Sequence, residues 1–130
     1  MASREDLESF ISRLNDDLNS EEVDAGIWVL SPGDGGAQIV VSYDPPVVVF
    51  RVNVMDLPET GDQRNDLMKR LLELNADGLV HGSYGIEGSR VILSDALQLE
   101  NLDFNEFQAS LDSISLALAS HMAGLATFQE

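Results

Sequence analysis

The sequence predicts a single α+β domain spanning residues 1–130, with the element order α-βββ-α-ββ-α and a twisted, mostly antiparallel sheet flanked by helices. Two observations predict this class. Apolar residues recur every three or four positions in three segments, as they do in amphipathic helices. Between these segments lie short runs rich in β-branched residues, separated by turns that contain Gly and Pro. Short turns between consecutive strands favour antiparallel pairing, so the first strands should form a meander.

The first predicted helix covers residues 3–19. It begins with a capping-box pattern, in which Ser3 and Asp6 can each bond to the other's backbone N–H. The acidic stretch 20–24 follows this helix, and we interpret it as a connector. The apolar stripe of the helix consists of Leu7, Phe10, Ile11, Leu14 and Leu18.

Three strands are expected next, at residues 26–30, 37–43 and 47–55, with turns at 31–36 and 44–46. Side chains alternate between the two faces of a strand. In the third strand one face is wholly apolar and the other is mixed, so we expect this sheet to be covered on one side only. The apolar face consists of Val48, Phe50, Val52 and Val54, and the mixed face of Val47, Val49, Arg51 and Asn53.

The second half of the chain contains two more helices and two more strands. A helix is expected at 62–75, ended by Asn75 and Gly78, and strands are expected at 79–86 and 90–99. The last helix, at 104–125, begins with a second capping-box pattern. Its apolar face is broad enough to require cover from the sheet, from a partner subunit or from both. The heptad seam of this helix consists of Phe107, Leu111, Ile114, Leu118, His121 and Leu125.

The net charge of −16 is the strongest global feature of the chain. Binding to nucleic acid or to an anionic membrane is disfavoured, because both require clustered Lys and Arg. The chain has no cysteine, which excludes disulfides, thiolate nucleophiles and cysteine metal sites. It has no apolar run long enough to span a membrane and no signal-peptide pattern at its start, so we expect a cytoplasmic protein.

Catalytic chemistry has weak support in the sequence. His81 and His121 do not form any of the histidine pairs that bind zinc. Ser83 does not lie in a nucleophile elbow, although in a strand it would point the same way as His81. A hydrolase that uses His81 and Ser83 is therefore a distant alternative. We expect no catalytic residues, no cofactor and no metal site.

The apolar side chains give better support for a function. Two interpretations of the mixed face stay open: it is a solvated face, or Val47, Val49 and Arg51 form an apolar groove for an extended peptide. Trp28 lies close to the same sheet. It belongs either to the core or to the partner-binding surface, where aromatic residues are common anchors.

Five short segments carry a family resemblance. They are Leu71-Leu-Glu-Leu-Asn75 at the end of the second helix, Ser83-Tyr-Gly-Ile86 and Arg90-Val-Ile-Leu93 in the late strands, the stretch 97–103, and Phe104-Asn-Glu-Phe107 at the start of the last helix. Together with the element order, the small size and the acidic pI, these segments make the chain resemble the type III secretion chaperone family, of the Tir chaperone type. The related YbjN-like proteins share that fold. The resemblance extends over essentially the whole chain.

This resemblance implies a homodimer that binds an extended segment of a client protein across its sheet and first helix, without a cofactor and without catalysis. The leading hypothesis is thus a cytoplasmic, chaperone-like protein-binding module. The alternative is a YbjN-like adapter or regulator that binds a folded partner. The positions that match the client-binding region are Leu7, Phe10, Leu14, Val47, Val49 and Arg51, and those that match the dimer region are Leu67, Leu71, Ile92 and Leu93.

Overall fold

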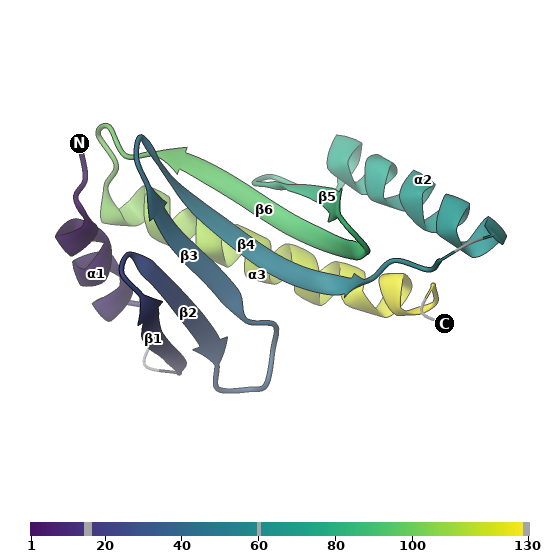
Figure 1. Ribbon diagram of the computed structural model, residues 1–130, viewed down its shortest axis with the longest axis horizontal. Coiled ribbons are helices and arrows are strands. Elements are labelled where there is room, and N and C mark those ends of the chain that lie inside the picture. The colour runs from purple at the N-terminus through teal and green to yellow at the C-terminus, as the bar shows by residue number, and fades with distance from the viewer. Residues whose placement is uncertain (15–16, 60, 129–130) are drawn as a thin grey trace.

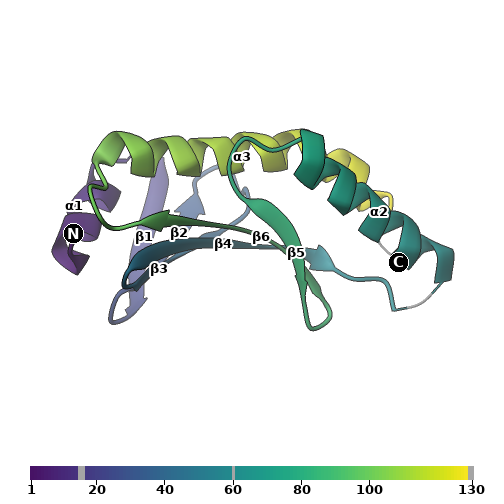
Figure 2. The same ribbon diagram turned by 90° about the horizontal axis from the view of Figure 1, so that it is seen from above.

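The computed structural model describes residues 1–14, 17–59 and 61–128. In these residues, three helices lie on one side of a six-stranded antiparallel sheet with the spatial order β1-β2-β3-β4-β6-β5 (Figures 1 and 2). The long helix α3 crosses the sheet, with α1 beside its start and α2 beside its other end (Figure 2). The helices are α1 (Arg4–Ser12), α2 (Gly61–Asp77) and α3 (Phe104–Ala126). The strands are β1 (Leu18–Asp24), β2 (Ile27–Pro32), β3 (Ile39–Asp44), β4 (Val47–Asp56), β5 (Ser83–Glu87) and β6 (Arg90–Gln98).

The predicted α+β class is confirmed, but the sheet has one strand more than the sequence indicates. Helix α1 ends at Ser12, and the residues assigned to the end of that helix and to a connector include the edge strand β1. The helical spacing of Leu18 is misleading, because Leu18 packs on the core from a strand that pairs with β2. Glu21 and Glu22 lie in this strand, and charged side chains on an edge strand oppose pairing with other chains.

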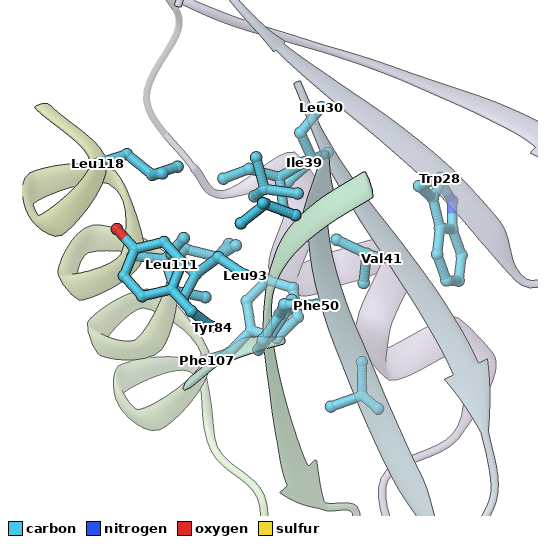
Figure 3. Packing of buried hydrophobic residues seen from close by; sticks show 14 of the residues in the cluster. Trp28, Leu30, Ile39, Val41, Phe50, Tyr84, Leu93, Phe107, Leu111 and Leu118 are labelled. Carbon is cyan, nitrogen blue, oxygen red and sulfur yellow. The ribbon is translucent and has the colours of Figure 1, made fainter. Parts of the chain in front are cut away.

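The core lies between α3 and the side of the sheet that faces it (Figure 3). The predicted seam of α3 is buried along its length, except at His121, which is partly exposed. Phe107 on α3 packs against Phe50 on β4 and Phe10 on α1, with ring centroids 5.2 Å and 5.6 Å from its own. The predicted capping box of α1 is confirmed, so the helix is held at its start as well as by packing.

The buried face predicted for β4 is confirmed as far as Val52. Beyond it, the pairing of β4 with β6 shifts register between Asn53 and Met55. A β-bulge adds one residue to a strand and so exchanges the two faces beyond it. Val54 is therefore only partly buried, although it still packs against the core, and Met55 takes the fully buried position.

Asn75 does not end α2 as the sequence indicates, because the helix continues to Asp77. The Asn75 side chain bonds instead to both backbone groups of Tyr84 in β5. Its Nδ2 donates to the Tyr84 carbonyl at 3.0 Å, and the Tyr84 N–H donates to its Oδ1 at 2.7 Å. Asn75 thus supplies at this outer edge of the sheet the hydrogen bonds that a further strand would supply.

Candidate functional site

One face of the sheet carries no helix among the described residues. This face, here called the open face, is the side of the sheet away from α3 (Figure 2). Antiparallel sheets with one solvated face usually place polar residues there, whereas a contiguous exposed apolar patch marks an interaction surface. The partly exposed apolar side chains of this face, here called the open-face patch, are Ile27 and Val29 of β2, Val40 of β3, Val47 and Val49 of β4, and Ile92 of β6.

Arg51 lies within the open-face patch. Its direct neighbours across the sheet are Val40 on β3 and Ser94 on β6. Two positions earlier on β4, Val49 lies opposite Ala96. Arg51 is therefore set among apolar and hydroxyl side chains. Arginine is enriched among the residues that contribute most to protein interfaces.

The guanidinium group of Arg51 forms an ion pair with the carboxylate of Glu87 on β5. The Arg51 side chain is 36% exposed and the Glu87 side chain is 65% exposed. The contact joins Nη2 of Arg51, an atom that is itself buried, to Oε2 of Glu87. Ion pairs between side chains this exposed add little to stability.

A hollow of about 420 Å³ lies next to this part of the open face. It forms where β5 begins, since Ser83 is the first residue of β5 and lies opposite Ser94 of β6. Beyond Ser94, β6 has no neighbour on that side among the described strands. The hollow is lined by Val49, Gly82, Ser83, Ser94, Asp95 and Ala96.

His81 lies close to a carboxylate, but not in the arrangement that a hydrolase requires. Its Nδ1 is 3.8 Å from Oδ2 of Asp95. The same oxygen accepts a 2.5 Å hydrogen bond from the buried Ser110, and Oδ1 of Asp95 accepts the N–H of Ala96 at 2.9 Å. Within the part of the chain that the structure describes, no hydrogen bond joins His81 to Ser83, the contact that would activate a nucleophile. The bond from Ser110 to Asp95 links α3 to β6.

A second hollow, of about 490 Å³, lies between α1 and the start of α3. Phe10 and Phe104 line it, with ring centroids 6.1 Å apart, and the guanidinium of Arg13 lies 4.1 Å from the Phe104 ring centroid. Aromatic rings beside a cation form a surface suited to an apolar side chain with a polar end. The hollow is completed by Met1, Ala2, Asp6, Asn101, Leu102 and Asp103.

The residues predicted to bind a partner fall into two regions that the structure does not bring together. Val47, Val49 and Arg51 lie on the open face. Phe10 and Leu14 lie on the helix side, at or just after α1, and both are partly exposed. Leu7 and Trp28 are buried in the chain's own core, so in this structure they support the surface and do not form it. Arg4 covers Trp28, with its guanidinium 5.7 Å from the ring centroid.

The residues predicted for a dimer interface are mostly internal. Leu67, Leu71 and Leu93 are buried within the chain, and Ile92 is partly exposed on the open face. Accessible apolar residues of the same region include Leu72 on α2, which is 69% exposed, Val80 between α2 and β5, and Ile86 on β5. Leu72 lies about 100° around the helix from Leu71, and in this structure it falls outside the buried face.

Tyr84 and His121 link β5 to α3 through a hydrogen bond of 2.7 Å between the Tyr84 hydroxyl and Nδ1 of His121. Burial raises the pKa of Tyr84 to about 12, so the hydroxyl keeps its proton at neutral pH and can donate it. Burial, and then the positive charge of Arg70, lower the pKa of His121. At neutral pH the imidazole is therefore uncharged and its Nδ1 accepts the hydrogen bond.

We expect the free energy of unfolding to fall as the pH drops below 6.5, because the unfolded chain protonates His121 there while the folded chain, with its lower pKa, resists protonation. Well above that pH His121 is neutral in both states and contributes no pH dependence. Urea unfolding at neutral and mildly acidic pH measures this effect in the wild type and in His121→Gln. The variant should lose less stability on acidification. An equal loss in both proteins would assign the pH dependence to other groups.

Two other kinds of site find no support in the described residues. No group of three His, Cys, Asp or Glu side chains is placed to hold a metal ion in residues 1–14, 17–59 and 61–128. Over the same residues, no helix combines the length and the apolarity that crossing a bilayer requires.

Comparisons with known proteins point to one family. A family model described as CesT_Tir_1 matches residues 1–130. The chain is similar to a chain in the structure of the heterodimeric complex ExoU-SpcU from the type III secretion system of Pseudomonas aeruginosa, with 15% identity, a TM-score of 0.57, and coverage of 89% of this chain and 85% of that one. It is also similar to YbjN from E. coli, with 13% identity, a TM-score of 0.70, and coverage of 94% and 93%. No curated protein sequence matches the chain.

Proposed function

The family match covers the whole chain, so the protein belongs to the CesT_Tir_1 family of type III secretion chaperones, and we propose that it holds an extended segment of a client protein on its open face. Family membership supports a protein-binding chaperone role. The fold is the one seen in the ExoU-SpcU complex and in YbjN. The client, its segment and the surface that binds it are the parts that we propose here.

The open-face patch is the observation that carries this proposal. An extended segment presents every second side chain to one side, and a flat apolar sheet face can accommodate such side chains along neighbouring strands. The patch extends over four strands, from Ile27 and Val29 on β2 to Ile92 on β6, without a helix over it among the described residues. The hollow at Phe10 and Phe104 is a second contact for the same client, on the helix side.

We propose that the protein is a cytoplasmic homodimer that catalyses no reaction and uses no cofactor. We assign the second copy to the region of α2 and the late strands, where Leu72 and Ile86 offer exposed apolar side chains. Leu67, Leu71 and Leu93 lie beneath that region and keep it rigid. The net charge of −16 keeps the protein and its complex soluble.

Affinity capture of the tagged protein from a lysate of its own cells, followed by mass spectrometry, tests this function. We expect one dominant partner, held through a segment that protease cleaves when the partner is free and spares when it is bound. Val49→Asp should weaken capture by tenfold or more, roughly the cost of placing a charge in an apolar contact. Leu116→Asp is the matched control, because it adds the same charge to an exposed leucine on α3.

Two results would contradict the proposal. Equal capture by Val49→Asp and by the wild type would mean that the open face does not bind the client. A partner whose protease sensitivity does not change on binding would favour the second candidate function, an adapter for a folded protein. The observation that favours this second candidate is the similarity to YbjN, which covers 93% of the YbjN chain.

A further inference from the structure

Arg51 differs from the other cation of the open face in what surrounds it. Among the described residues of this face, the second cation is Arg90 at the start of β6, which lies between Asp56 and Glu87 in the strand register. Acids therefore flank Arg90 on both sides. The direct neighbours of Arg51 are Val40 and Ser94, neither of which carries a charge. Arg51 is the cation placed to meet a ligand within the apolar part of the face.

Glu87 covers Arg51 with an ion pair that is open to solvent. Its Oε2 contacts Nη2 of the guanidinium, and an ion pair between side chains this exposed adds little to stability, so another carboxylate can compete for Arg51. The Glu87 side chain is 65% exposed, on the last residue of β5. Glu87 also lies directly opposite Arg90, so it retains a cation when it leaves Arg51. After the exchange Glu87 still lies beside Arg90, which it shares with Asp56.

We propose that Arg51 binds a carboxylate of the client segment in place of Glu87. The inference rests on the proposed function, and it adds the chemistry of the partner: one Asp or Glu side chain with apolar side chains at the alternate positions around it. Arginine suits this role, because its planar group can donate two parallel hydrogen bonds to a carboxylate. Val40, across the sheet, and Val49, on the same strand, select the apolar neighbours.

The surroundings of Arg51 favour a client segment with a single acidic residue. Ser94 lies directly across from Arg51, and Ser83 lies across from Ser94, so two hydroxyl groups continue the row beside the bound carboxylate. A segment with many acidic residues would be repelled by a chain of net charge −16. A single carboxylate between apolar side chains gains the ion pair at little cost in long-range repulsion.

Selection of random peptides displayed on phage tests the inference with wild type and Arg51→Gln as targets. We expect the wild type to enrich one Asp or Glu at a fixed place between alternate apolar residues, and Arg51→Gln to enrich the apolar pattern alone. Circular dichroism confirms that the variant is folded. Wild-type peptides without a preferred acid, or an acid preference that survives in Arg51→Gln, would overturn the inference and leave the proposed function standing. No enrichment on either target would count against the proposed function itself.

A binding measurement tests whether a client carboxylate replaces Glu87 at Arg51. It compares a peptide enriched in the phage selection with an analogue in which the acidic residue of that peptide is replaced by its amide. The wild type should prefer the acidic peptide by about tenfold, as is usual for a hydrogen bond to a charged group, and added salt should reduce the preference. Glu87→Gln should bind the acidic peptide several-fold tighter than the wild type. Asp112→Asn removes the same charge from an exposed position on α3, away from the open face, and is the matched control. An equal gain in both variants would attribute the effect to net charge and overturn the exchange.

Discussion

Replacing Phe107 with Ala should lower the free energy of unfolding by about 3–5 kcal/mol, the usual cost of removing a buried aromatic ring. Phe107 is fully buried on α3, and its ring meets both Phe50 on β4 and Phe10 on α1. The change removes the ring that joins the sheet to two helices, and it leaves a cavity that rigid neighbours fill only in part. Urea unfolding followed by circular dichroism measures the loss as a lower midpoint at an unchanged slope.

Leu116→Ala is the control for this change. Leu116 lies on the same helix but is 69% exposed, so its truncation removes few contacts and should alter stability by less than about 0.5 kcal/mol. A loss near that small value for Phe107→Ala would mean that α3 does not form the centre of the core. A large loss for Leu116→Ala would mean that the outer face of α3 is covered in solution.

The strands of the meander and the seam of α3 could be predicted because periodicity alone determines them. Val48, Phe50 and Val52 alternate with half-exposed residues, and Phe107 to Leu125 repeats by heptads, so each pattern identifies one buried side. Strand β1 could not be predicted in this way. Its sequence is polar and acidic, and only pairing with β2 makes it a strand. In an edge strand, neighbouring contacts override the local pattern.

The candidate site depends on contacts between residues far apart in the sequence, so fewer of its features could be predicted. The mixed face of β4 is visible in the sequence, and so are Val47, Val49 and Arg51. The ion pair of Arg51 with Glu87 is not, since it depends on the register of β4, β6 and β5 together. The burial of Trp28 and Leu7 could not be predicted either. The sequence pattern of an apolar residue is the same whether its side chain faces the core or a partner.

Both functional proposals follow from one property of the architecture. All three helices of the described residues lie on the same side of the sheet (Figure 2), so the core is complete on that side and the opposite face is left to carry Ile27, Val29, Val40 and Val49 without cover. Fixed strands hold these side chains, so binding there costs little ordering of the protein itself. The entropy cost then falls on the client segment, which is consistent with a chaperone that acts on chains before they fold.

Replacing Gly82 with Ala should lower the free energy of unfolding by roughly 2–4 kcal/mol, from two physical causes that add. The φ angle of Gly82 is +81°, which is unfavourable for any residue with a Cβ. A Cβ built there would lie 2.8 Å from the Ser94 carbonyl oxygen and 3.5 Å from Cβ of Asp95. The backbone oxygen cannot turn aside as a side chain can, so β5 must move away from β6 at its first pair.

Gly88→Ala separates these two causes. Gly88 also has a positive φ angle, +61°, but no atom lies within 4 Å of a Cβ at that position. It should therefore lose about 1 kcal/mol, from backbone strain alone. Amide exchange provides the second measurement: Gly82→Ala should speed exchange in β5 near Ser83 and Tyr84, whereas Gly88→Ala should leave these amides protected. Equal losses in the two variants would show that β5 does not approach Ser94 closely, and the hollow beside Arg51 would then have a different shape.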